Sequence, residues 1–196
     1  MRATALLVAT LIAGLAGVGC GNEEKFAGSP DPATERNDPP AKPPPGWRTF
    51  ANRRAGFTVS VPPGWPARAR GSATLIRSPE RLLAVTVAAD RSEAARTTRP
   101  NGYALRAFRA LPGFRGLKPM QRRRVARSPY PSARVDGVGT LAQRRQRQHI
   151  TVAAFRRGKH ATYAVVAFAA PAGHALAHAG EFNQLLASLR ARRPVL

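Results

Sequence analysis

The chain has a single cysteine, Cys20, among its 196 residues. One thiol cannot close an internal disulfide, so a disulfide framework is excluded. A zinc site built from several cysteine thiolates is excluded for the same reason. The role of Cys20 must therefore be sought outside disulfide and metal chemistry.

Acidic residues are scarce: 10 Asp and Glu stand against 32 Lys and Arg, which gives a formal net charge of +22. No two carboxylates from residue 46 onward are spaced like a general acid–base pair. The motifs of serine hydrolases, P-loop proteins and dinucleotide-binding proteins are also missing. We therefore predict a protein that is not an enzyme. The alternative is an envelope hydrolase that brings Asp136 or Glu93 together with a histidine.

Histidine is also rare, with four residues in the chain. His174 and His178 are four residues apart, so both would face one side of a helix and reach one metal ion. A stable site needs further ligands and an ordered outer shell, and only Glu181 is near enough in sequence to add one. Ala175 stands where a zinc protease motif has its glutamate. We expect neither a metal nor a cofactor.

The basic residues are mostly arginine, with only four lysines. Alanine, arginine, glycine and proline share GC-rich codons, so part of the charge reflects genome composition. Guanidinium groups pair well with phosphates, which makes the arginine runs candidates for a basic patch. The candidates are Arg122, Arg124, Arg144, Arg145, Arg147, Arg156 and Arg157. No aromatic residue falls within 115–129 or 131–154 to stack on bases, so we expect an anionic lipid or cell-wall polymer rather than nucleic acid as the polyanion.

The N-terminus has the layout of an export signal. Arg2 is followed by the uncharged, mostly apolar residues 3–19 and then by Cys20. This resembles a bacterial lipoprotein signal, which is cleaved before a cysteine whose thiol accepts the lipid. Gly19 fits that pattern, whereas Gly17 stands where leucine is usual, so an uncleaved anchor and secretion with a free Cys20 stay open. We predict a signal peptide at 1–19, a palmitate-bearing anchor on Cys20 and a location on the outer face of the cytoplasmic membrane.

A proline-rich segment separates this signal from the rest of the chain. Residues 21–46 hold seven prolines and one large apolar side chain, Phe26, so they cannot bury enough surface to fold. We predict a disordered tether over 20–46 and one domain over 47–196. The tether to Pro45 has five acidic and three basic residues, a net charge of −2, and the remainder has 28 basic and five acidic residues, a net charge of +23.

The domain has the patterns of a mixed α and β protein. Alternation and turn residues predict strands at 47–50, 57–61, 73–77, 82–89, 121–127, 134–143, 148–155 and 162–169. Helical spacing predicts helices at 100–111 and 174–192. Turns at 78–81 and 156–159 predict hairpins and so an antiparallel sheet. Residues 82–89 are apolar on both faces, which indicates helices on both sides of the sheet.

Three segments in this layout carry a resemblance to a known family. They are GFTVSVPPGW at 56–65, YAVVAFAAP at 163–171, and the helix with Phe182, Leu185, Leu186 and Leu189. The pattern resembles the PsbP-like superfamily, which includes bacterial lipoproteins of the DcrB and LpqN type, and covers most of 46–190. The resemblance implies an α/β/α fold of the α+β class and roles in binding and assembly. It implies no reaction and no catalytic residues.

These inferences combine into one hypothesis about function. The protein is predicted to be a non-enzymatic, lipid-anchored envelope protein whose domain binds a partner protein or an envelope ligand. One alternative is an electrostatic binder of anionic lipid or cell-wall polymer. Another is a carrier whose apolar ligand sits in a pocket between sheet and helix.

Overall fold

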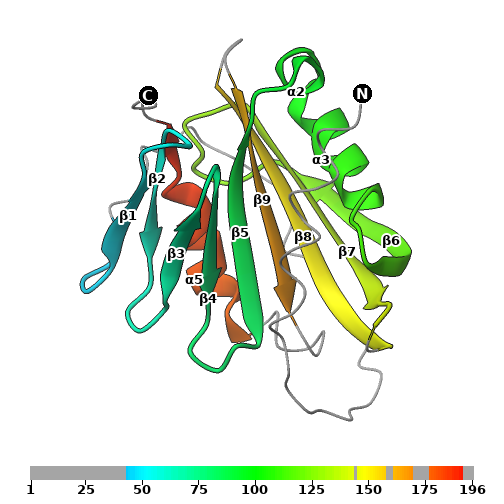
Figure 1. The fold of residues 1–196 in the computed structure, drawn as a ribbon, viewed down its shortest axis with the longest axis horizontal. Helices are drawn as coiled ribbons and strands as arrows, with labels where there is room; N and C mark the ends of the chain where they lie inside the picture. The colour runs from blue at the N-terminus through cyan, green and yellow to red at the C-terminus, as the bar shows by residue number, and fades with distance from the viewer. Residues whose placement is uncertain (1–42, 144, 158–160, 170–176, 192–196) are drawn as a thin grey trace.

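A computed structural model describes residues 43–143, 145–157, 161–169 and 177–191 of the chain. Its main element is a seven-stranded antiparallel sheet with the strand order β3-β4-β5-β9-β8-β7-β6 (Figure 1). These strands are β3 Ala67–Arg70, β4 Ala73–Arg77, β5 Leu83–Asp90, β6 Phe114–Arg123, β7 Ser132–Leu141, β8 Gln146–Arg157 and β9 Ala161–Ala169. The late strand β9 inserts between β5 and β8, so the sheet joins both halves of the domain.

A smaller sheet has the order β1-β2-β10 and combines the two ends of the described domain. Its strands are β1 Arg48–Asn52, β2 Phe57–Val61 and β10 Arg190–Ala191. The buried Asn52 links this sheet to the main one, because its amide nitrogen donates to the Ala73 carbonyl at 3.0 Å and to the Thr74 hydroxyl at 3.1 Å. The first and last strands are thereby held against the main sheet.

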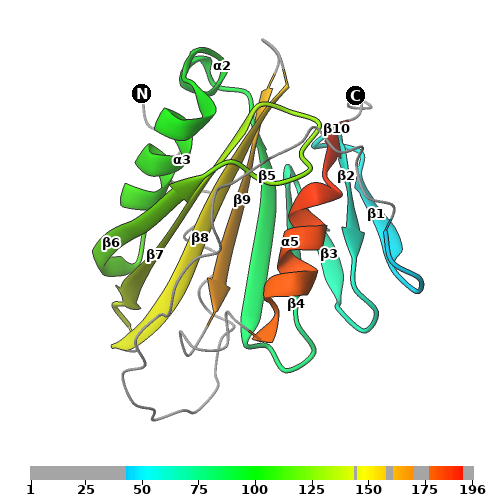
Figure 2. The ribbon, with the colours of Figure 1, turned by 180° about the vertical axis from the view of Figure 1, so that it is seen from behind.

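Helices cover both faces of the main sheet. Helix α3, Pro100–Arg109, packs on β6, β7 and β8, and helix α5, Ala179–Ala187, lies on the opposite face (Figures 1 and 2). Strand β8 shows the division, because Ile150 and Val152 pack with α3 whereas Ala153 and Phe155 pack with α5. The predicted α/β/α architecture is confirmed, with the side chains of one strand alternating between two cores.

Most of the predicted elements are present within one or two residues. Strands 57–61 and 73–77 have the predicted bounds, and the strands predicted at 134–143 and 148–155 are β7 and β8. β8 and β9 pair as the hairpin prediction requires, while the turn at 158–160 lies outside the described residues. Alternating polarity located β2, although the structure buries all five of its residues, including Thr58 and Ser60.

Two predicted boundaries were wrong. The strand predicted at 121–127 is β6 and runs from Phe114 to Arg123, because Gly116 and Pro119 are accommodated at irregular positions of an edge strand. The helix predicted at 174–192 ends at Ala187, since Arg190 and Ala191 pair with β2; its predicted start at 174–176 lies outside the described residues.

Three short elements were not predicted. They are β3, β10 and helix α2, Glu93–Thr97. Ser92 caps the N-terminus of helix α2, because its hydroxyl accepts a hydrogen bond from the Ala95 amide at 3.2 Å. Elements this short carry too little periodicity to be read from sequence alone. Within the described ranges, no helix combines the length and apolar character that a membrane span needs.

Candidate functional site

A buried network of charged and polar side chains surrounds Asp136 in β7. The Asp136 carboxylate oxygen Oδ1 accepts hydrogen bonds from Arg134 Nε at 2.8 Å and from the Thr151 hydroxyl at 2.5 Å. Arg134 Nη2 lies 2.7 Å from the same oxygen, and Arg123 Nη2 lies 3.4 Å from Oδ2. Asp136 is 4% exposed and Arg134 is 8% exposed, so this is a largely desolvated ion pair.

Strand register brings these side chains together. Arg123 pairs with Arg134 across β6 and β7, and Asp136 pairs with Thr151 across β7 and β8. Residues paired across antiparallel strands project from the same face, and alternate residues of a strand share a face. The network therefore lies on the α5 face, where Arg134 also donates to the Asn183 side chain at 2.7 Å. Its guanidinium carbon lies 5.2 Å from the centre of the Phe182 ring.

The surroundings shift the pKa of both members of the ion pair. Burial by itself raises the pKa of the Asp136 carboxyl, but His149, Arg134 and Thr151 stabilise its charged form more strongly, so that pKa lies well below its usual range. His149 Nε2 is 3.6 Å from Oδ1, longer than a hydrogen bond, so we attribute most of the stabilisation to Arg134 and Thr151. Burial lowers the pKa of Arg134, and the adjacent carboxylate partly restores it.

The network does bring Asp136 close to a histidine, the arrangement that the hydrolase alternative requires. The Thr151 hydroxyl lies 2.5 Å from Asp136 but 3.4 Å from His149 Nε2, so it is bonded to the carboxylate. A carboxylate with a lowered pKa is a weak base and does not activate a hydroxyl as a nucleophile. The proximity that the hydrolase alternative requires is therefore present, but Thr151 is not activated as a nucleophile, and this geometry supports a structural role for the network.

The edge strand β6 carries the most exposed basic surface beside this network. Arg115, Lys118, Arg122 and Arg123 are all exposed, and β6 contains no acidic residue. Met120 lies among them in the strand and is 54% exposed. Among the described residues it is the large hydrophobic side chain that is exposed. We call these five residues the β6 edge. The arginine runs in the sequence pointed to the end of this edge but not to Arg115, Lys118 or Met120, because the strand was predicted to begin after Met120.

The predicted basic-patch residues fall into separate groups, and Arg144 lies outside the described residues. Arg122 and Arg124 lie at the end of β6, whereas Arg145 and Arg147 lie at the turn between β7 and β8. Arg122 pairs with Val135 of β7, and Arg147 pairs with Thr140 of the same strand. These two positions on β7 are five residues apart, so the two groups of arginines are separated by about 17 Å along the strand. The prediction that these arginines bind a polyanion stays a prediction.

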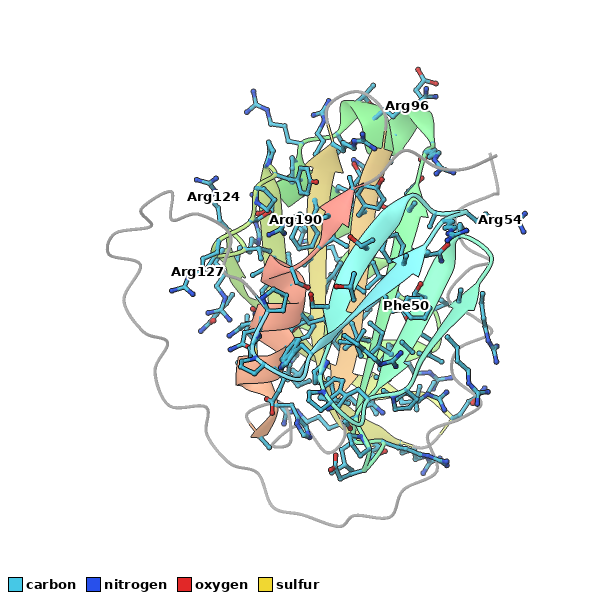
Figure 3. All side chains as sticks on the ribbon, turned by 90° about the vertical axis from the view of Figure 1, so that its left-hand side faces the viewer. Phe50, Arg54, Arg96, Arg124, Arg127 and Arg190 are labelled. Atoms are coloured by element: carbon cyan, nitrogen blue, oxygen red, sulfur yellow. The ribbon has the colours of Figure 1, made fainter. Side chains whose placement is uncertain are left out.

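The other predicted arginines lie at the far end of β8. Arg156 and Arg157 end that strand, and Arg156 Nη2 donates to the Arg96 carbonyl of α2 at 2.5 Å. Figure 3 shows Arg124 and Arg127 on the segment after β6, on the opposite side of the domain from Arg54. Arg190 is also basic, but its guanidinium donates to the Ala187 and Leu189 carbonyls and so caps the end of α5.

The histidine pair considered for a metal is only partly described, because His174 lies outside the described residues. His178 precedes α5 and stacks edge-on against Trp65, with ring centres 5.4 Å apart. Its Nε2 lies 3.5 Å from the Glu80 carboxylate. In the part of the chain that the structure covers, no cluster of three or more histidine, cysteine, aspartate or glutamate residues has the arrangement of a metal site.

Comparison with known proteins gives structural likeness without sequence likeness. No protein-family model matches the chain, and no curated protein matches it by sequence. The cyanobacterial PsbP protein CyanoP from Synechocystis has a TM-score of 0.55 at 8% identity, over 74% of this chain and 92% of that chain. The Saccharomyces cerevisiae Ran-binding protein Mog1p has a TM-score of 0.53 at 9% identity, over 74% of this chain and 95% of that chain.

A crystal structure from Bacteroides thetaiotaomicron is also similar, with a TM-score of 0.51 at 14% identity over 75% of this chain. The match spans 49% of that protein, so the chain corresponds to about half of its length. At these identities the likeness shows the fold alone. The expected PsbP-like fold is confirmed, with Mog1p and CyanoP sharing it.

Proposed function

We propose that this protein is a non-enzymatic binding protein held at the outer face of the cytoplasmic membrane by lipid on Cys20. The observation that carries the proposal is the combination of a PsbP-like domain with a lipoprotein-type signal and a proline-rich tether. One protein that shares the fold, Mog1p, is described as Ran-binding. By analogy, the domain of this chain binds a partner protein in the cell envelope.

The order of the segments supports this proposal. All described helices and strands lie between Arg48 and Ala191, downstream of the predicted tether. The tether has a net charge of −2 and the remainder has a net charge of +23. The charged surface is therefore carried by the folded domain, and a tether of this composition lets the domain reach partners near the membrane.

The carrier alternative gains no support from the described core. Leu185, Leu186 and Leu189 are at most 1% exposed and pack against residues of β2 and β5. Phe57 and Tyr163 fill the neighbouring space, with ring centres 6.0 Å apart. These side chains belong to one buried cluster and contact one another.

Replacement of the cysteine tests the anchor directly. We expect Cys20→Ser to abolish incorporation of a clickable palmitate analogue and to move most of the protein from the membrane fraction to the soluble fraction, because serine lacks the nucleophilic thiolate. The measurement is in-gel fluorescence of the labelled chain together with detergent phase partitioning. A conservative control is Ser29→Ala in the tether. Equal labelling of the Cys20→Ser variant and the parent would refute lipidation at this residue.

Capture of partners from intact cells tests binding. We expect crosslinking of the anchored protein, followed by washes at low and then high salt, to retain one envelope protein after the high-salt wash. Hydrophobic and hydrogen-bonded interfaces survive salt that screens exposed charges. If only anionic polymers or lipids are recovered and high salt removes them, the domain is an electrostatic binder and the protein-partner proposal is wrong.

A further inference from the structure

We propose that the β6 edge is a docking surface for an anionic phospholipid membrane. It consists of Arg115, Lys118, Met120, Arg122 and Arg123. The inference rests on the proposed location of the protein at a membrane. It adds to that location a defined surface and an orientation of the domain, with β6 toward the lipid and β1 and β3 away from it.

The first support is the charge of the strand. β6 places four exposed basic side chains and no acidic one along ten residues, a length of about 33 Å. The Asp136 carboxylate beside this strand is buried and is paired with both Arg134 and Arg123. One carboxylate shared by two guanidinium groups leaves the edge with a net positive charge, and lipid phosphates complement it.

The second support is the position of Met120. Pro119 pairs with Gly137 and Gln121 pairs with Asp136, so Met120 is the extra residue of a bulge. A bulge re-aims the side chain it contains, and here that side chain is 54% exposed. A flexible apolar side chain on a strand that has basic residues before and after it matches the arrangement by which peripheral proteins insert into the boundary between head groups and acyl chains.

The third support is that the edge is unsuited to adding a strand from a partner. Pro119 has no backbone N–H to donate. A second register shift falls between Arg115 and Lys118, where Gly116 has a φ of +61°. These interruptions break the regular spacing of hydrogen-bonding groups that a new strand requires. A ligand of this edge must therefore be bound through side chains and charge. A lipid surface can bind in this way because it does not need to align with the strand residue by residue.

Vesicle binding by the lipid-free protein tests the proposal separately from the anchor. The protein is the chain from residue 20 onward with Cys20→Ser; it contains both buried clusters, which lie between residues 55 and 189, and so keeps a complete core. Vesicles contain either phosphatidylcholine alone or equal parts of phosphatidylcholine and phosphatidylglycerol. We expect sedimentation with the anionic vesicles only, and the binding to weaken as salt is raised.

Paired variants test whether the edge, rather than the overall charge, is responsible. Lys118→Gln with Arg122→Gln removes two charges from the β6 edge, and Arg68→Gln with Arg70→Gln removes two from the opposite, equally exposed edge β3. We expect the first pair to weaken binding about 25-fold, about fivefold for each residue, and the second less than about threefold. Equal losses for the two pairs would overturn the proposal.

Insertion of the side chain at position 120 is measured with a fluorophore. Since Cys20 is the sole cysteine, Met120→Cys in the Cys20→Ser background provides a unique site for an environment-sensitive dye. We expect a blue shift on anionic vesicles at this site and none at Arg68→Cys. An absent shift at position 120, or no binding to anionic vesicles, would overturn membrane docking. The palmitate-labelling experiment on Cys20 would still test the lipid anchor independently of this result.

Discussion

Replacement of Asp136 by asparagine is expected to lower the free energy of unfolding by about 3–5 kcal/mol. The variant leaves the Arg134 guanidinium charged and 8% exposed beside a neutral amide. An amide also cannot accept both the 2.8 Å bond from Arg134 and the 2.5 Å bond from Thr151 as strongly as a carboxylate does. Denaturant unfolding of the parent and the variant measures the difference.

A double variant separates the ion pair from the packing around it. Arg134→Met with Asp136→Leu removes both charges while retaining much of their volume. We expect this double variant to be less destabilised than Asp136→Asn, because neither partner is left charged and alone in the interior. A loss below about 1 kcal/mol for Asp136→Asn would contradict a desolvated ion pair at this position.

The same pair predicts a pH dependence of stability. The pKa of Asp136 is lower in the folded state than in the unfolded state. Its contribution is therefore fully present above the unfolded pKa of about 4 and declines as the pH falls from there toward the folded value. The difference in unfolding free energy between the parent and Asp136→Asn should shrink as the solution is acidified below about pH 4. A difference independent of pH would assign the loss to steric effects.

Substitution of Gly137 by valine is expected to cost about 3 kcal/mol or more, because a side chain at this position collides with fixed atoms. A Cβ would lie 2.3 Å from the Lys118 carbonyl oxygen, 2.6 Å from Phe108 Cζ and 3.0 Å from Pro119 Cα. Two of these atoms belong to the backbone of β6 and cannot rotate away. Valine by itself favours β-strands, so a large loss of stability would be due to the steric collision and not to strand propensity. Thermal or denaturant unfolding measures it.

Gly180 provides the matched control in the same chain. It lies on α5, is exposed, and has no atom within 4 Å of an added Cβ among the described residues. We expect Gly180→Ala to be neutral or to stabilise the domain by up to about 1 kcal/mol, because alanine favours helices. If Gly137→Val left stability unchanged, the close packing of β7 against β6 and α3 would be wrong.

The sequence by itself determined the layers of this domain. Residues 82–89 are apolar on both faces, and this pattern predicted the burial of both sides of β5, whereas the alternating residues 57–61 located a strand but did not show that both of its faces are buried. The helical spacing of Phe182, Leu185, Leu186 and Leu189 likewise recorded one buried side of α5. Such patterns are local, so the longer strands, helices α3 and α5 and the α/β/α order could be predicted from them, whereas β3, β10, helix α2 and the bounds of β6 could not.

Only the tertiary structure decided which polar residues meet. Asp136 and Thr151 are 15 residues apart and touch because β7 and β8 pair in one particular register. Arg123 joins them from β6, whose bounds were not predicted because Gly116 and Pro119 lie beside register shifts of an edge strand. The exposure of Met120 depends on the same bulge. Register and bulges arise from pairing between distant segments, which no local pattern encodes.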